Sequence, residues 1–154
     1  MRTNWKTISS FATRKWNGQG GNAKLGILVW HHAVTGDRKV ADTDSIKRLA
    51  EAGYRILLHG DVHVERDDLL HHLDPRQRIH VIGGGAFGAH AHDRPESTPR
   101  LYSLLDVSRD QSEVRVVRRR QRTAEGPYEA YAVYPGPDEN TKKADYTIAF
   151  ATGD

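Results

Sequence analysis

The chain has 154 residues, with 23 lysines and arginines against 20 aspartates and glutamates, and it contains no cysteine. This length allows one domain with a hydrophobic core, and the lack of cysteine excludes disulfides and thiolate metal sites, so imidazole and carboxylate would have to hold any metal. We find neither an apolar run of membrane-spanning length nor a cleavable leader, and we expect a cytoplasmic protein with no membrane partner.

The first predicted elements form a strand–helix–strand unit. Residues 25–30 (LGILVW) are a continuous apolar run, which is typical of a buried strand. A helix is predicted over residues 44–52, with Gly53 as its C-cap, because apolar residues recur on one face. Residues 54–58 (YRILL) predict a second buried strand. This spacing favours a parallel βαβ crossover.

The rest of the chain is predicted to be mostly strand. Residues 66–73 indicate a short helix, and residues 78–82 a strand that runs into a glycine-rich turn. Turn residues then separate four strand-like segments, which favour an antiparallel β-meander: 100–107, 113–119, 128–134 and 145–150. The sequence thus predicts an α+β fold, a short βαβ unit plus an antiparallel β-meander, in residues 24–154, preceded by a flexible N-terminal arm of residues 1–23.

One basic cluster, Arg118-Arg119-Arg120 with Arg122, ends a predicted strand. It allows two interpretations, a nucleic-acid surface or a solvated strand end. Such a charge run is more typical of a solvated face, and a high isoelectric point does not by itself predict nucleic-acid binding. We therefore expect no nucleic-acid partner.

Histidine is distributed unusually, because all nine histidines lie between His31 and His92. Histidines confined to one region, several of them in pairs or in His-x-His spacing, indicate metal coordination or acid–base chemistry. Polar residues also follow three predicted strands directly, and strand ends are where α/β folds usually hold ligands.

The first two of these strand ends are His31-His32 and the segment His59-Gly60-Asp61-Val62-His63. In an extended segment Asp61 and His63 point to the same side, so both could reach one metal. The intervening glycine lets the backbone come close to a bound group. The alternative for a single histidine at a strand end, a hydrogen-bonded packing role, stays open.

The third strand end is the glycine-rich segment 83–88, followed by His90-Ala91-His92-Asp93. It has two interpretations. If the segment lines a metal cleft, His90, His92 and Asp93 border that cleft, together with His32 and His59. Otherwise it is a tight irregular turn with incidental histidines.

The order VWHHAVTG, LLHGDVH, a glycine-rich strand end and RPESTPRLYSLLDV resembles the C-terminal half of calcineurin-like metallophosphoesterases. In that family a strand ends in His-His-Pro, and a helix and a strand then lead to Leu-His-Gly-His-x-His. The resemblance covers residues 25–150. It implies half of a four-layer α-β-β-α sandwich, a divalent metal (Mn, Fe or Zn) and a phosphate-ester substrate.

Carried over by position, the resemblance makes His31, Asp61 and His63 the metal ligands. His31 matches the first histidine of His-His-Pro, and His32 its neighbour, which is usually not a ligand. His63 matches the last histidine of Gly-His-x-His, whereas Asp61 stands where the first histidine of that motif is expected. Ala33 replaces the proline. A carboxylate is an acceptable ligand for these metals.

The family's N-terminal motifs Asp-x-His, Gly-Asp and Gly-Asn-His do not occur in residues 1–22. Those motifs supply the bridging aspartate and the acid–base histidine, so no catalytic residue is assigned in this chain, and the isolated chain would hold one ion or none. Two hypotheses follow. Either another chain supplies an N-terminal half and completes a phosphoesterase, or the chain is an inactive interaction or regulatory module, for example as a homo-oligomer.

Overall fold

The computed structural model describes residues 25–33, 43–60, 67–70, 78–88, 99–123 and 125–150. The predicted N-terminal arm, residues 1–23, lies outside these residues. The described residues fall into two compact units, divided between Ile82 and Gly83. Among the residues described, no helix has the length and apolar character needed to cross a membrane.

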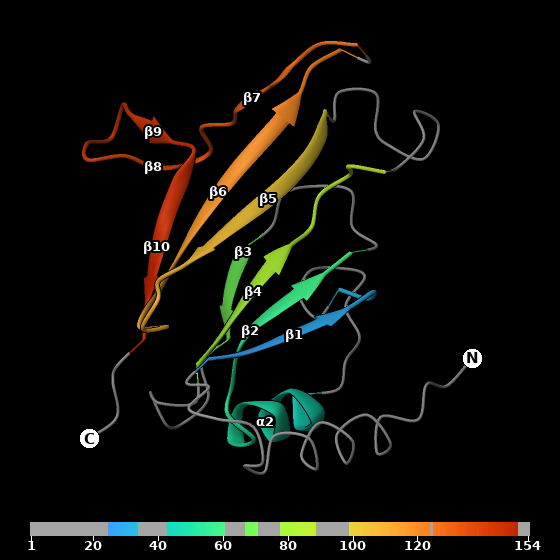
Figure 1. The fold of residues 1–154 in the computed structure, drawn as a ribbon, viewed down its shortest axis with the longest axis vertical. Helices are drawn as coiled ribbons and strands as arrows, with labels where there is room; N and C mark the ends of the chain where they lie inside the picture. Colours follow the sequence, from blue (N-terminus) through green and yellow to red (C-terminus); the bar gives the residue numbers. More distant parts are fainter. Residues whose placement is uncertain are drawn as a thin grey trace. The chain divides into compact units, whose positions relative to one another are not determined.

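The first unit contains a four-stranded sheet with the strand order β1-β2-β4-β3. Figure 1 draws β1, β2 and β4 running in one direction and β3 in the other. The four strands and the helix between the first two have these bounds: β1 Gly26–Trp30, α2 Thr43–Glu51, β2 Tyr54–His59, β3 Asp67–Leu70 and β4 Ile79–Gly83. Strands β1 and β2 pair in parallel, with Trp30 opposite His59. The predicted βαβ crossover is therefore confirmed.

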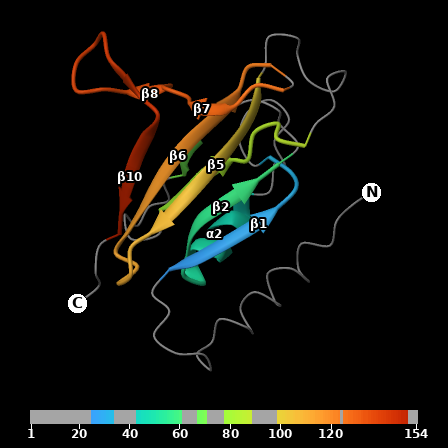
Figure 2. The ribbon, with the colours of Figure 1, turned by 45° about the horizontal axis from the view of Figure 1, so that its top comes forward.

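Helix α2 packs on one face of this sheet (Figure 2) because its apolar residues recur at helical spacing. Burial of each large apolar side chain contributes about 1.5–3 kcal/mol. The helix ends as predicted, since Gly53 has a positive φ of 96°, and the Arg55 guanidinium donates to the carbonyl of Ala50 at 2.9 Å. The buried core of the unit joins residues of α2, β2 and β4: Ile46, Leu49, Ala50, Leu57, Ile79 and Val81.

The predicted short helix over residues 66–73 is wrong, because residues 67–70 form β3. This strand pairs antiparallel with β4, and Asp67 lies opposite Ile82. A segment of this length has too few residues to nucleate a stable helix without packing, whereas a neighbouring strand offers its backbone groups direct partners. The free edge of β4 therefore decides the conformation of this segment.

The second unit contains an antiparallel sheet in the order β10-β6-β5, with β7 also paired to β6, and a separate two-stranded sheet of β8 and β9. Figure 1 shows β5, β6 and β10 as its long strands. Their bounds are β5 Arg100–Val107, β6 Glu113–Gln121, β7 Tyr128–Ala130, β8 Tyr134–Pro135, β9 Lys142–Lys143 and β10 Asp145–Ala149. The fold is thus mixed α+β, with one helix and otherwise strands within the described residues.

The predicted meander is correct for β5, β6 and β7 and wrong after them. Residues 128–134 do not form one strand, because one edge of β6 is shared by two partners. Strand β7 pairs with β6 at residues 119–121, and β10 pairs with β6 at residues 113–117. The chain must leave β6 after β7 to make room for β10, and this break separates β7 from β8.

Alternate residues of β6 face the core of the second unit, as the period of two requires. Val114, Val116 and Arg118 are buried on this face. The expectation that the arginine cluster is a solvated strand end is therefore wrong for Arg118, which is fully buried. Strand alternation places it inward, where its guanidinium donates to oxygen acceptors that include the Gly83 carbonyl and the Tyr134 hydroxyl.

Candidate metal centre

The two adjacent parallel strands β1 and β2 both end in histidine. His31 and His32 follow β1 directly and are exposed, whereas His59 is the last residue of β2 and is buried. Because parallel neighbours end at the same edge of a sheet, the two strand ends meet there. The β1–α2–β2 connection thus brings together histidines that lie far apart in the sequence.

The ring of His31 lies against Gly60, the residue that follows β2. A Cβ atom added to Gly60 would lie 3.5 Å from Nδ1 of His31 and 3.6 Å from its carbonyl oxygen. The rings of His31 and His32 are neighbours, with centroids 5.1 Å apart. The first proposed ligand therefore lies beside the residue directly before Asp61.

His59 is 3% exposed, and its Nδ1 lies 2.9 Å from the carbonyl oxygen of Gly60. A carbonyl oxygen can only accept, so this hydrogen bond requires a proton on Nδ1. In the neutral imidazole Nε2 then carries a lone pair and acts as an acceptor. Nε2 is buried and has no hydrogen-bond partner among the described residues. Such an orphaned acceptor costs about 1–3 kcal/mol.

The predicted site residues are thus described in part. His31, His32 and His59 are brought to one edge of the sheet, whereas five predicted residues lie outside the described part of the chain: Asp61, His63, His90, His92 and Asp93. Within the part that the structure describes, no three histidine, aspartate or glutamate residues are arranged to hold a metal.

The described part of the glycine-rich loop is explained by packing within the second unit. Gly85 has a positive φ of 75°, and a Cβ there would lie 2.6 Å from Cβ of Leu101. Phe87, 59% exposed, contacts the rings of Tyr102 and Tyr128, with centroids 5.7 Å away in both cases. This segment fits the interpretation as a tight irregular turn.

The anchor of this loop is a residue that the sequence pattern did not single out. The guanidinium of Arg118 donates from Nη1 to the carbonyl of Gly83 at 2.7 Å and from Nε to the hydroxyl of Tyr134 at 3.2 Å. The alternation of β6, which places residues 114, 116 and 118 on one face, was the signal that could have identified Arg118 as inward-facing. The loop after β4 is thus fixed by a side chain of β6.

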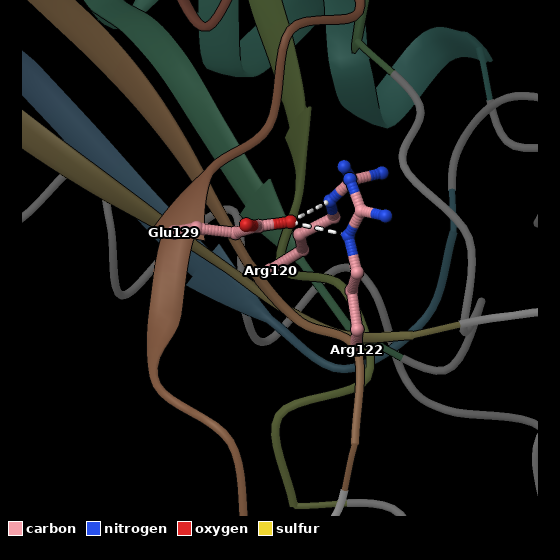
Figure 3. Close-up of polar contacts among 3 residues, drawn as sticks. All are labelled: Arg120, Arg122 and Glu129. Carbon is pink, nitrogen blue, oxygen red and sulfur yellow. Dashed lines mark hydrogen bonds and ion pairs between the residues drawn. The ribbon is translucent and has the colours of Figure 1, made fainter.

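Two other arginines of the cluster engage a carboxylate (Figure 3). Arg120 and Arg122 both donate from Nε to Oε1 of Glu129, at 2.8 and 2.5 Å. The hydrogen bond from Arg122, followed by that from Arg120, holds the pKa of Glu129 below its usual value. Arg120 also stands over the ring of Tyr131, 4.7 Å from its centroid. Each of these two guanidinium groups thus makes at least one contact within the second unit.

No model of a known protein family matches this chain, and a search of curated proteins gave no significant match.

Proposed function

We propose that residues 24–154 are the C-terminal part of a calcineurin-like, metal-dependent phosphoesterase that hydrolyses phosphate esters. The observation that supports this most directly is the position of the His31 ring beside Gly60 at the common end of β1 and β2. The two motifs on which the resemblance rests, HHAVTG and LLHGDVH, are separated in sequence by a helix. Their meeting at one sheet edge is what a shared metal centre needs.

The donor chemistry at this edge fits a divalent metal. His31 and His63 offer imidazole nitrogens and Asp61 offers a carboxylate, a set that suits Mn, Fe or Zn. A bound divalent ion would polarise the phosphate ester and acidify an attacking water.

The chain's own residues account for metal binding rather than for the complete reaction. His31 and His63 bind as neutral ligands, whereas Asp61 brings a negative charge where the resemblance expects a neutral imidazole. That charge favours harder ions. The remaining ligands and the acid–base residue would come from a second chain with the motifs Asp-x-His, Gly-Asp and Gly-Asn-His.

The exposed apolar side chains of β1 support the proposal of a partner. This partner is either such an N-terminal half or a second copy of this chain. Val29 is 70% exposed and Ile27 37%, and β1 is the terminal strand in the order of its sheet. The strand GILVW has no charge or proline, the devices that usually protect a sheet edge. In the proposed architecture the chain forms half of a four-layer α-β-β-α sandwich.

A second candidate is a catalytically inactive interaction or regulatory module of the same fold. The substitution of aspartate for histidine at Asp61 favours it, because this change alters a position that the resemblance assigns to a ligand. The exposed face of β1 would then serve assembly alone.

The test combines calorimetric metal titration with turnover of an aryl phosphodiester. We expect the purified chain to bind Zn or Mn weakly without turnover, and to gain turnover when a chain with the three N-terminal motifs is added. Binding without turnover in that mixture would favour the inactive module. Robust hydrolysis by the purified chain would contradict the split-enzyme proposal, and absence of metal binding would contradict the metal centre.

A further inference from the structure

One face of the sheet in the second unit carries an aromatic cluster, formed by Phe87, Tyr102 and Tyr128. The rings of Tyr102 on β5 and Tyr128 on β7 have centroids 4.8 Å apart, and the ring of Phe87 lies 5.7 Å from each of them. Phe87 is 59% exposed, and both tyrosines are half-buried. Contiguous exposed apolar groups, unlike single ones, mark interaction sites.

The strand register places Arg119 on the same face as the aromatic cluster. Arg119 of β6 lies directly opposite Tyr102 of β5. Directly opposite residues of an antiparallel pair point to the same side, with Cβ atoms about 4.5–5.5 Å apart. On the other edge of β6, Gln121 lies opposite Tyr128 of β7. The face therefore combines three aromatic rings with a guanidinium group.

The arginines at the end of β6 have different surroundings. Arg118 is buried on the opposite face, and Arg120 and Arg122 both donate to Glu129 (Figure 3). Within the described residues, the guanidinium of Arg119 makes no hydrogen bond or ion pair. The expectation of no nucleic-acid partner treated these arginines as one solvated strand end, whereas strand alternation leaves Arg119 available beside the rings.

The charges on this face are separated along the strands. Its acidic residues lie toward the start of β6: Asp106, Glu113 and Asp145. There Asp145 pairs with Arg115 at 2.7 Å. At the other end of the face, Arg100 adds a second positive charge beside the aromatic cluster, and its Nε is buried without a hydrogen-bond partner among the described residues. A buried donor without a partner indicates an absent acceptor, strain or a functional role.

We propose that this face of β5, β6 and β7 binds single-stranded nucleic acid. The bases stack on the aromatic cluster, and Arg119 and Arg100 contact the phosphates. Aromatic rings within a basic surface suit single strands, because every base has a π-face and every linkage carries a negative charge. This inference concerns the second unit alone and does not rest on the proposed metal centre.

The shape of the surface favours a polymer over a free nucleotide. Small-molecule sites are concave and bury most of the ligand surface. The aromatic cluster instead lies on a sheet face that continues to Leu104, whose side chain is 49% exposed. An extended strand can follow such a face from one ring to the next, whereas a duplex keeps its bases stacked on each other and presents none to the rings.

The test measures binding of a fluorescein-labelled oligothymidylate of about 12 nucleotides by fluorescence anisotropy over a series of salt concentrations. A chelator is present throughout, so that the proposed metal centre cannot contribute. Phe87→Ala removes one exposed ring, and Arg119→Gln removes one charge. Arg115→Gln is the matched control, because it makes the same change of charge on the same face of β6, at a guanidinium that pairs with Asp145.

The two variants should differ in how their binding depends on salt. We expect Phe87→Ala to weaken binding by about fivefold to a hundredfold without changing the salt dependence. Arg119→Gln should lower the slope of the logarithm of the binding constant against the logarithm of salt concentration by about 0.7. Arg115→Gln should remain near wild type in both respects. A duplex of the same length and inorganic polyphosphate should both compete more weakly than unlabelled oligothymidylate.

Three outcomes would overturn the proposal. The first is no binding of oligothymidylate at low salt. The second is unchanged binding by Phe87→Ala with equal effects of the two arginine variants, which would indicate attraction by charge alone. The third is polyphosphate that competes as well as the oligonucleotide. Should a variant not fold, photo-crosslinking of wild type to an oligonucleotide that contains bromodeoxyuridine decides. Adducts on the aromatic cluster support the proposal, and adducts found only elsewhere overturn it.

Discussion

The fully buried guanidinium of Arg118 donates a 2.7 Å hydrogen bond to the carbonyl of Gly83, the residue at which β4 ends. A buried cation is costly unless polar partners surround it. Here the partners are the start of the glycine-rich loop and the hydroxyl of Tyr134. One side chain of β6 therefore holds both the start of the loop after β4 and the first residue of β8.

Replacing Arg118 by methionine should destabilise the protein by about 1.5–3 kcal/mol, the usual contribution of hydrogen bonds to a charged group. The carbonyl of Gly83 would lose its donor in a buried place. Urea denaturation measures the effect. Arg115→Met is the control on the same strand, because Arg115 is exposed and pairs with Asp145 at 2.7 Å. We expect about 0.2–1 kcal/mol there, and equal losses in both variants would contradict the anchoring role.

Gly85→Ala should destabilise the protein by about 1–3 kcal/mol, because the residue combines a positive φ with contact to β5. The added Cβ would lie 2.6 Å from Cβ of Leu101 and 2.8 Å from its carbonyl oxygen. Gly88→Ala is the matched control in the same loop, where a Cβ would meet nothing within 4 Å. Thermal denaturation should place Gly88→Ala near the wild type. A Gly85→Ala protein as stable as Gly88→Ala would refute the packing explanation of this loop.

Asp110 should make the stability of the protein depend on pH in the acidic range. The hydroxyls of Ser108 and Ser112 and the amide of Ser112 donate to its carboxylate and lower its pKa from 3.8 to about 2. A depressed folded-state pKa stabilises the fold above the unfolded value, and this contribution is lost as pH falls from 3.8 toward about 2. The advantage of wild type over Asp110→Asn in urea midpoint should therefore shrink across that interval. A difference in urea midpoint that stays constant across this interval would contradict the stabilising role of the Asp110 carboxylate.

The parts of the fold in which apolar residues form a clear run or recur at a clear period could be predicted from the sequence. The strand–helix–strand unit and β5 follow from apolar runs and helical spacing, and the proximity of His31 to Gly60 follows from the parallel crossover. The conformation of residues 67–70 could not be predicted, because the free edge of β4 decides it. The buried Nε2 of His59 could not be predicted either. The pattern HGDVH indicates on which side of the strand each side chain lies, but it does not indicate whether one ring nitrogen is buried.

Val29→Lys should reduce self-association or partner binding through β1. The side chain is 70% exposed on a strand that carries no charge, and an added lysine is a common device against pairing at a sheet edge. Sedimentation velocity should show a shift toward monomer with little loss of stability. Val107→Lys is the control, since Val107 is an exposed valine at the end of β5. If wild type and both variants sediment as monomers, β1 is not a self-association surface.

His59→Leu should not destabilise the protein, because it removes a buried acceptor that has no partner among the described residues. Without metal, leucine removes the orphaned buried acceptor, whose desolvation costs about 1–3 kcal/mol, and gives up one hydrogen bond to Gly60 of about 0.5–1.5 kcal/mol. The metal-free variant should therefore be as stable as wild type or about 1 kcal/mol more stable. Thermal denaturation of both proteins in the presence of a chelator measures the difference. If the variant is less stable than wild type by about 2 kcal/mol or more without metal, Nε2 of His59 is satisfied in the folded protein.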